Sequence, residues 1–332
     1  MGLMAKRHLI FGSFLLALLL GANCFATDAQ EAIDKAEALL RAGKVKQAEA
    51  LLTSASAADP NSATLHGALG KVLFGEQKYE DAVREFGLAV QGQPDSREYN
   101  MLLSEALMGW RHFQVAVDFL HAVQPRFEQY PEFHYDLGFA YYNTNKMNEA
   151  LAEFKEALRL APNLDRAEFL LASTLAAQGE TAKSAEIFRK LTREHPTRAV
   201  YWVTLGEILG DMSEENYPEA LKACRRALAL KPTDAHIQYV TATVLLKSGD
   251  YPGARPLFER LEKIGPKSLE VHVALAKIYG RMGQRELAHK EAETVTELQN
   301  QKNELQGQIE KGRAEFDRPI QQGQQGSGPV QP

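Results

Sequence analysis

A repeat of 34 residues constrains the fold of this chain more than any other feature of its sequence. The segment 145–163 repeats the pattern of small, aromatic and charged residues of the segment 78–94, which lies two periods earlier. Prolines follow the same interval, with spacings of 34, 68 and 34 residues between Pro60, Pro94, Pro162 and Pro196. Counting from the prolines gives eight units, which begin at residues 29, 63, 97, 131, 165, 199, 235 and 269. A fixed period of this length is typical of a stacked repeat array.

Small residues recur at two positions of every unit. Position 8 holds Ala36, Gly70, Ser104, Gly138, Ala172, Gly206, Ala242 and Ala276. Allowing for two residues inserted near 213–216, position 20 holds Ala48, Ala82, Ala116, Ala150, Ser184, Ala220, Ala254 and Ala288. Positions 4, 7, 8 and 11 share one helical stripe, and positions 20, 24 and 27 share another. Each unit is therefore predicted to be a helical hairpin whose two helices approach closely at positions 8 and 20.

This pattern resembles the tetratricopeptide repeat family, whose units have 34 residues, paired helices, small residues at positions 8 and 20 and proline at position 32. The resemblance covers about residues 29–300 and implies an all-α, right-handed superhelical solenoid. The domain boundaries expected from it are a repeat solenoid over 27–300, a capping helix extension over 301–318 and a disordered tail over 319–332, which is rich in Gln, Gly and Pro.

The N-terminus has the three-part pattern of a secretory signal peptide over residues 1–26. Lys6 and Arg7 precede the apolar run 9–20, and small residues precede a cut after Ala26. Cleavage would leave a periplasmic or secreted protein and would move its formal charge from −5 to −7, because the segment carries two cations and no acid. An uncleaved segment that anchors the protein to a membrane is the alternative. An acidic domain is also a poor partner for nucleic acid.

Two interpretations of the C-terminal segment 297–312 stay open. The segment would cover the last apolar face of the solenoid as a capping helix. Alternatively, Val295, Leu298, Leu305 and Ile309 fit a heptad seam that would support a homodimer, although Lys302 and Gly312 interrupt it.

No motif for catalysis, metal binding or cofactor binding occurs in the sequence, so a catalytic site, a metal and a cofactor are not expected. His66, His134 and His272 all occupy position 4, but their units are not adjacent, so packing is expected instead of a shared metal. Cys224 occupies position 24, an interior site, and is expected to be an inert thiol. The chain is therefore predicted not to be an enzyme and not to have a small-molecule substrate.

The family resemblance implies a groove lined by positions 2, 5, 9, 12 and 13 of the first helices. The groove residues expected to contact a protein or peptide are Phe74, Met101, Met108, Tyr135, Phe139, Tyr142, Asn143, Arg166, Phe169 and Tyr239. Further polar groove positions are Lys71, Glu105 and Glu207. Exposed aromatic residues in a row favour binding. The alternative is that these rings pack between neighbouring first helices.

Family members that hold a peptide's terminal carboxylate use Lys and Asn at positions 5 and 9, and this clamp is missing here. The predicted function is an exported, non-catalytic scaffold that binds a protein or peptide in its groove. The alternative is a structural subunit of a cell-envelope assembly, for secretion or outer-membrane biogenesis, that uses its convex face or its C-terminal helix. Fold alone does not decide between them.

Overall fold

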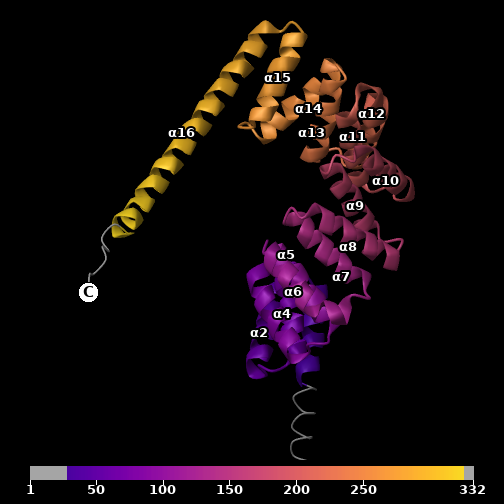
Figure 1. Cartoon of the computed structure of the whole chain (residues 1–332), viewed down its shortest axis with the longest axis vertical. Coiled ribbons are helices and arrows are strands. Elements are labelled where there is room, and N and C mark those ends of the chain that lie inside the picture. Colours follow the sequence, from indigo (N-terminus) through magenta and orange to yellow (C-terminus); the bar gives the residue numbers. More distant parts are fainter. Residues whose placement is uncertain (1–27, 325–332) are drawn as a thin grey trace, which may run out of the picture. The chain divides into compact units, whose positions relative to one another are not determined.

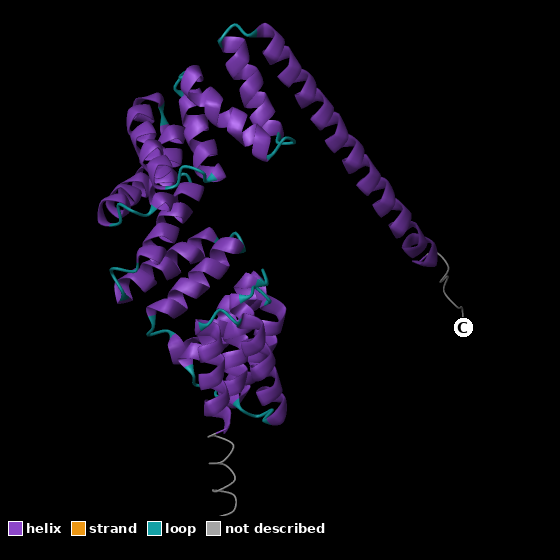
Figure 2. Cartoon of the chain, turned by 180° about the vertical axis from the view of Figure 1, so that it is seen from behind, coloured by secondary structure: helices purple, strands orange, loops and turns teal. Residues whose placement is uncertain are grey.

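The computed structural model describes residues 28–324, and every regular element in that range is a helix, with no strand (Figure 2). The expected signal peptide, residues 1–26, lies outside the described residues, as do residues 325–332 of the expected tail. Among the described residues, no helix combines the length and the apolar character that a membrane span requires.

The described chain divides into two compact units, one that ends at Gln178 and one that begins at Gly179. In the N-terminal unit, the first helices of the repeats are residues 28–41, α3 (Ala63–Gly75), α5 (Arg97–Gly109), α7 (Pro131–Asn143) and α9 (Asp165–Ala177). The second helices there are α2 (Val45–Ala58), α4 (Tyr79–Gly92), α6 (Phe113–Phe127) and α8 (Met147–Leu160).

The C-terminal unit continues the same order. Its first helices are α11 (Ala199–Met212), α13 (Ala235–Lys247) and α15 (Leu269–Arg281). Its second helices are α10 (Thr181–Glu194), α12 (Tyr217–Leu230), α14 (Tyr251–Ile264) and α16 (Arg285–Gln324). From α3 onward, each first helix begins at the residue where the sequence places a repeat start. The expected all-α fold of tandem helical hairpins is therefore confirmed.

The closest approach within a hairpin joins position 8 to position 24. A Cβ atom added to Gly138 would lie 2.8 Å from the ring of Phe154, and one added to Gly70 would lie 2.6 Å from the ring of Phe86. Both rings are fully buried. The sequence predicted that position 8 would face position 20, but the tightest contact at these two glycines is with the ring at position 24. A small residue at position 8 thus makes room for a large one on the second helix.

In seven of the eight hairpins, the turn has a left-handed residue at position 15. Glycine occupies this position at Gly43, Gly179, Gly249 and Gly283, with φ between 71° and 83°. Gln77, Arg111 and Asn145 adopt the same conformation, with φ between 60° and 64°. In repeat 6 the insertion replaces this turn, because Ser213 is extended and Glu214–Asn216 form a short 3-10 helix.

The fourth residue of the first helix anchors the loop before it. In six repeats its side chain donates a hydrogen bond to the carbonyl oxygen six residues earlier, where proline usually stands. The pairs are His66 and Pro60 (2.9 Å), Asn100 and Pro94 (3.0 Å), His134 and Glu128 (2.7 Å), Trp202 and Pro196 (3.1 Å), Gln238 and Pro232 (2.7 Å), and His272 and Pro266 (3.0 Å). These bonds satisfy loop carbonyls that no helix ladder reaches.

The three histidines at position 4 also contact a glutamate 19 residues later, on the second helix of the same repeat. The Nδ1 to carboxylate distances are 2.7 Å for His66 and Glu85, 2.6 Å for His134 and Glu153, and 2.6 Å for His272 and Glu291. Burial lowers the pKa of His134 and His272, but the hydrogen bonds to the glutamate and the loop carbonyl outweigh burial and raise both pKa values. The histidines therefore join the two helices of a hairpin.

The last helix is longer than a cap requires. α16 has 40 residues and packs against α15, which has 13 (Figure 1). At 1.5 Å per residue these lengths correspond to roughly 60 Å and 20 Å, so most of α16 extends beyond α15. The helix also continues to Gln324, past the end expected at residue 318. The expected boundary at residue 300 is not visible, since the helix is continuous there.

Replacing Ala150 with leucine tests the packing at position 20. Ala150 is fully buried, and extra methylene groups in a filled core cost about 1–3 kcal/mol. We expect Ala150→Leu to lower the free energy of unfolding in urea by about that amount. Ala152→Leu is the matched control, because Ala152 is exposed on the same helix. Equal stability of the two variants would contradict the register assigned to α8.

Candidate functional site

The predicted aromatic residues of repeat 4 pack with residues from repeats 3 and 5 in the N-terminal unit. Tyr135 and Phe139 of α7 stack with ring centroids 6.4 Å apart and an interplanar angle of 12°. Phe113, the first residue of α6, meets Phe139 edge-on at 6.3 Å, and the Arg166 guanidinium lies 4.3 Å from the centre of the Tyr135 ring. Both α7 rings are half-buried. The rings therefore fill this part of the groove and expose only one side.

Tyr142 and Phe169 are also half-buried and pack against the hydrophobic core. Asn143 is exposed, but its side chain donates to the carbonyl oxygen of Phe139 in its own helix. Phe74 packs edge-on against Tyr79, the first residue of α4, with centroids 5.5 Å apart. Each of these side chains therefore already has contacts within the protein.

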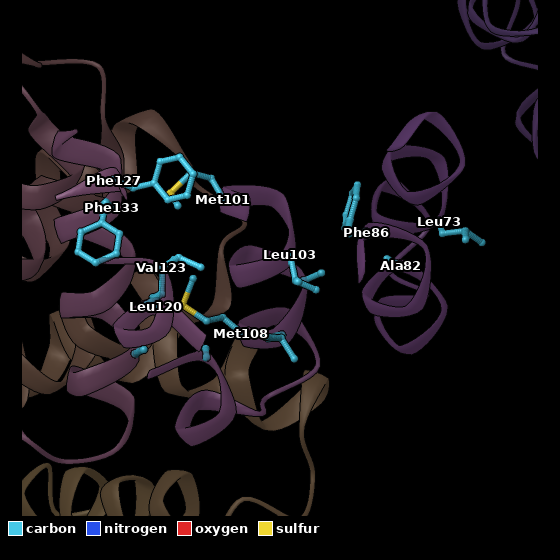
Figure 3. Packing of buried hydrophobic residues seen from close by; sticks show 14 of the residues in the cluster. Leu73, Ala82, Phe86, Met101, Leu103, Met108, Leu120, Val123, Phe127 and Phe133 are labelled. Carbon is cyan, nitrogen blue, oxygen red and sulfur yellow. The ribbon is translucent and has the colours of Figure 1, made fainter. Parts of the chain in front are cut away.

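Two predicted groove residues do not reach the surface. Met101 and Met108 are only 8% and 7% exposed and belong to the hydrophobic core. Figure 3 shows both side chains among core residues that include Val123 and Phe127. The expectation that they contact a ligand is therefore corrected. An unbranched methionine adapts to irregular gaps, and here the gap lies between α5 and α6.

An open hollow lies instead at the first two repeats, with a volume of about 580 Å³. Leu52, at position 24 of the first repeat, is one of its lining residues. Leu40 at the wall is 38% exposed. The other lining residues are Gln30, Ile33, Ala36, Glu37, Val45, Thr64, Ala68, Lys71, Val72, Gly75, Glu76 and Tyr99.

The C-terminal unit has a hollow at the equivalent place between repeats 7 and 8, with a volume of about 380 Å³. Tyr239 and Val273 in its wall are 36% and 50% exposed. The ring of Tyr239 packs edge-on against Phe258, with centroids 6.1 Å apart. A smaller hollow of about 140 Å³ adjoins it on the other side of Tyr239, and its lining includes Glu207.

Sequence reasoning did not identify these open places. It selected aromatic residues, which fill the groove where neighbouring rings are available. First-helix positions 5, 9 and 12 line both hollows, with Ile33 among them in one unit and Thr243 and Val273 in the other. Position 9 of the second repeat at each large hollow is a lysine, Lys71 in one unit and Lys277 in the other. The repeat positions of these lining residues were the sequence signal that could have located the hollows.

Asp136 is a buried carboxyl group that the sequence analysis missed. It is 1% exposed, and the Ser104 hydroxyl of the preceding repeat donates to it at 2.7 Å. Burial raises the pKa of Asp136 to about 8, against the opposing hydrogen bond from Ser104, and the Glu105 charge adds to the rise. Burial also raises the pKa of Glu105. The hydrogen bond between Ser104 and Asp136 joins α5 to α7. Because Asp136 is buried, it is not accessible to a substrate.

A buried thiol and a cluster of carboxylates around a histidine are two further groups with chemically active side chains. Cys224 is fully buried, and burial raises the pKa of its thiol to about 11, so it is not a thiolate at neutral pH. Glu262, His272 and Glu291 place ligand atoms within 4.8 Å of one another. However, both ring nitrogens of His272 already have partners, and the same histidine–glutamate pair occurs in repeats 2 and 4. His272 and Glu291 therefore form a structural ion pair within the hairpin and not a metal site.

Sequence models of the tetratricopeptide repeat match residues 39–106, 131–164, 166–198, 211–278 and 245–309, which together make up more than half of the chain. This chain belongs to the tetratricopeptide repeat family. The matched segment 131–164 begins at the start of α7, where the period places the fourth repeat.

Solved structures share the fold. A tetratricopeptide repeat protein from Parabacteroides merdae superposes with a TM-score of 0.61 and 17% identity over 76% of this chain and 99% of that one. The Cut9–Hcn1 hetero-tetramer of the APC/C matches with a TM-score of 0.58 and 14% identity over 80% of this chain and 52% of that one. At these identities the likeness concerns the fold alone.

A human protein, Protein O-mannosyl-transferase TMTC1, is 33% identical over 101 residues. The match covers 30% of this chain and 11% of the human protein, so this chain corresponds to a small part of that protein's length.

The buried carboxyl group predicts how stability depends on pH. The folded-state pKa of Asp136 is about 8, above the ordinary value of 3.8, so its contribution to stability falls as pH rises between these values. We expect Asp136→Asn to keep the hydrogen bond from Ser104 and to gain stability over the natural chain from pH 4 to pH 8. Urea unfolding at several pH values measures this difference, and the histidine contributions cancel because both proteins carry them. A difference that is constant with pH would contradict the assignment.

Proposed function

We propose that the protein is a non-catalytic scaffold that binds a protein or peptide through its groove face, defined as positions 2, 5, 9, 12 and 13 of the first helices. The observation that carries this proposal is the pair of equivalent hollows, one in each unit. Each has exposed apolar side chains, namely Leu40 in the N-terminal unit and Tyr239 and Val273 in the C-terminal unit. Exposed apolar groups in a depression with polar edges favour a polypeptide ligand.

The aromatic cluster has a supporting role in this proposal. Tyr135 and Phe139 order the middle of the groove face in the N-terminal unit, while their exposed edges, with Tyr142 and Phe169, offer surface for contact. Tyrosine is frequent among the residues that dominate interface energies. The absence of catalytic motifs and the protonated, buried thiol of Cys224 support a role in binding instead of chemistry.

A second candidate function is a structural subunit of a cell-envelope assembly that uses its C-terminal helix or its convex face. The observation that favours it is the exposed apolar seam of α16. Leu305 and Ile309 are 58% and 56% exposed, and they continue the stripe of Val295 and Leu298. A helix with such a seam is stabilised when it packs against another helix, and a second copy of this chain supplies an identical seam.

Export is also part of the proposal, on the basis of the basic start, the apolar run 9–20 and the small residues before a cut after Ala26. The exported chain would act in the periplasm or outside the cell, with membrane anchoring as the alternative if the segment stays attached. Cleavage would leave Cys224 as the single thiol, so the chain folds without an internal disulfide.

Two substitutions in α7 test the aromatic contribution to binding. We expect Phe139→Ala combined with Tyr142→Ala to weaken partner capture in a crosslinked pulldown from envelope extract, while circular dichroism retains most of the helicity. Phe139 contacts Phe113 and Tyr135, so some loss of thermal stability is expected in Phe139→Ala alone. Lost stability combined with unchanged capture would remove this cluster from the binding surface.

Self-association tests the second candidate. We expect Leu305→Asp combined with Ile309→Asp to shift any dimer to monomer in analytical ultracentrifugation, because charges on the seam oppose burial. Asn300→Asp combined with Asn303→Asp is the matched control, since these residues lie outside the seam. A natural chain that stays monomeric at high concentration would exclude homodimerisation through α16.

The processing site tests export. We expect N-terminal sequencing of the protein from an envelope fraction to begin near Thr27. Replacing Ala26 with a bulky residue is expected to leave the precursor uncleaved, because signal cleavage requires a small residue before the cut. Recovery of the natural chain with Met1 intact would refute cleavage and favour the membrane anchor.

A further inference from the structure

The groove face of the C-terminal unit carries two unpaired charges on either side of its apolar hollow. Glu207 of α11 and Lys277 of α15 both occupy position 9 of a first helix, and both are exposed. Within the described residues neither of them forms an ion pair, whereas Asp211 and Lys247 between them are paired with each other. Glu270 of α15 also lines the larger hollow, but it accepts a hydrogen bond from the Ser268 hydroxyl. Glu207 on α11 and Lys277 on α15 are therefore the charged lining residues of this face that have no side-chain partner among the described residues.

The apolar part of this surface lies between the charges. Tyr239 of α13 separates the two hollows and lines both of them. The larger hollow has Phe258 at its floor and the half-exposed Val273 in its wall, with Lys277 at its edge. The smaller hollow has Glu207 at its edge. The order along the face is thus an acid, an aromatic ring, an apolar hollow and a base.

This order determines the chemistry of a complementary ligand. Helices pack about 8–10 Å apart, so two steps from α11 to α15 along this face span roughly 20 Å. An extended chain covers that distance with about six residues. A peptide with a basic residue near Glu207, an apolar side chain in the larger hollow and an acidic group near Lys277 would satisfy all three features. Charge pairs at the edge of an interface give mainly specificity and orientation.

We propose that the groove face of the C-terminal unit binds an extended polypeptide segment in which an apolar side chain lies between a basic residue and an acidic one. The apolar side chain enters the hollow beside Val273, and the charged residues pair with Glu207 and Lys277. The direction of the bound segment follows from the order of these charges. This inference rests on the proposed scaffold function and specifies the ligand class for one unit.

The direct test uses fluorescein-labelled peptides with blocked ends and fluorescence anisotropy on the full mature chain. The matched probe is Lys-Ser-Gly-Leu-Ser-Gly-Asp, the second probe has glycine in place of leucine, and the third has glutamate at the first position and lysine at the last. We expect saturable binding of the matched probe, at least fivefold weaker binding of the glycine probe, and weaker binding of the third probe.

Charge-reversal variants identify the contact residues. We expect Lys277→Glu to weaken binding of the matched probe by about threefold to fivefold, as is typical of a single exposed ion pair, and a probe ending in lysine to restore it. Lys267→Glu is the control, because it makes the same charge change on an exposed loop outside the hollow. Val273→Asp tests the hollow, and a thermal melt checks that it folds.

Failure of this inference is distinguishable from failure of the scaffold function. If crosslinking of the natural chain captures a partner and Lys277→Glu and Glu207→Lys leave that complex unchanged, the scaffold function stands and this site is wrong. Equal binding of the three probes, or no binding of the matched probe, also overturns the site. The site is supported if the probe that ends in lysine restores binding to Lys277→Glu and if Lys267→Glu binds the matched probe as the natural chain does.

Discussion

The close contact between position 8 of one helix and position 24 of the next is the interaction on which the rest of each unit depends. A glycine without a Cβ atom brings the backbone of α7 against the ring of Phe154, and the same contact recurs between Gly70 and Phe86. A ring held by backbone on one side sets both the spacing and the rotation of the hairpin. The first helices consequently present the same positions to the groove face in successive repeats.

The sequence was sufficient to predict the helices and their repeat starts because the period is present in every unit, although it placed position 20 and not position 24 opposite position 8. The starts of α3, α5 and the later first helices coincide with the predicted repeat starts, and the two-residue insertion appears as an extra turn before α12. What it did not reveal was the pairing of His134 with Glu153 or of His66 with Glu85. That signal was present, since glutamate occurs 19 residues after a position-4 histidine in all three cases.

The candidate site was harder to predict because residue type does not determine exposure. Met101 and Met108 occupy groove positions in the repeat, yet neighbouring side chains of α6 cover them. The position of a hollow depends on the size of several side chains from different helices at once, as with Leu52 and Ile33 in the N-terminal unit. The buried carboxyl of Asp136 depends likewise on a serine 32 residues earlier, and a single-repeat pattern cannot show this.

The insertion in repeat 6 has a practical consequence. One of the two extra residues lengthens α11 to 14 residues, where α9 and α13 have 13, and the other lies in the connection to α12, where Ser213, Glu214 and Glu215 are exposed. Loop length costs little conformational free energy once a connection is already irregular. This connection is therefore a permissive position for a spectroscopic label or an inserted reporter domain, which would allow the C-terminal unit to be observed without altering its helix pairs.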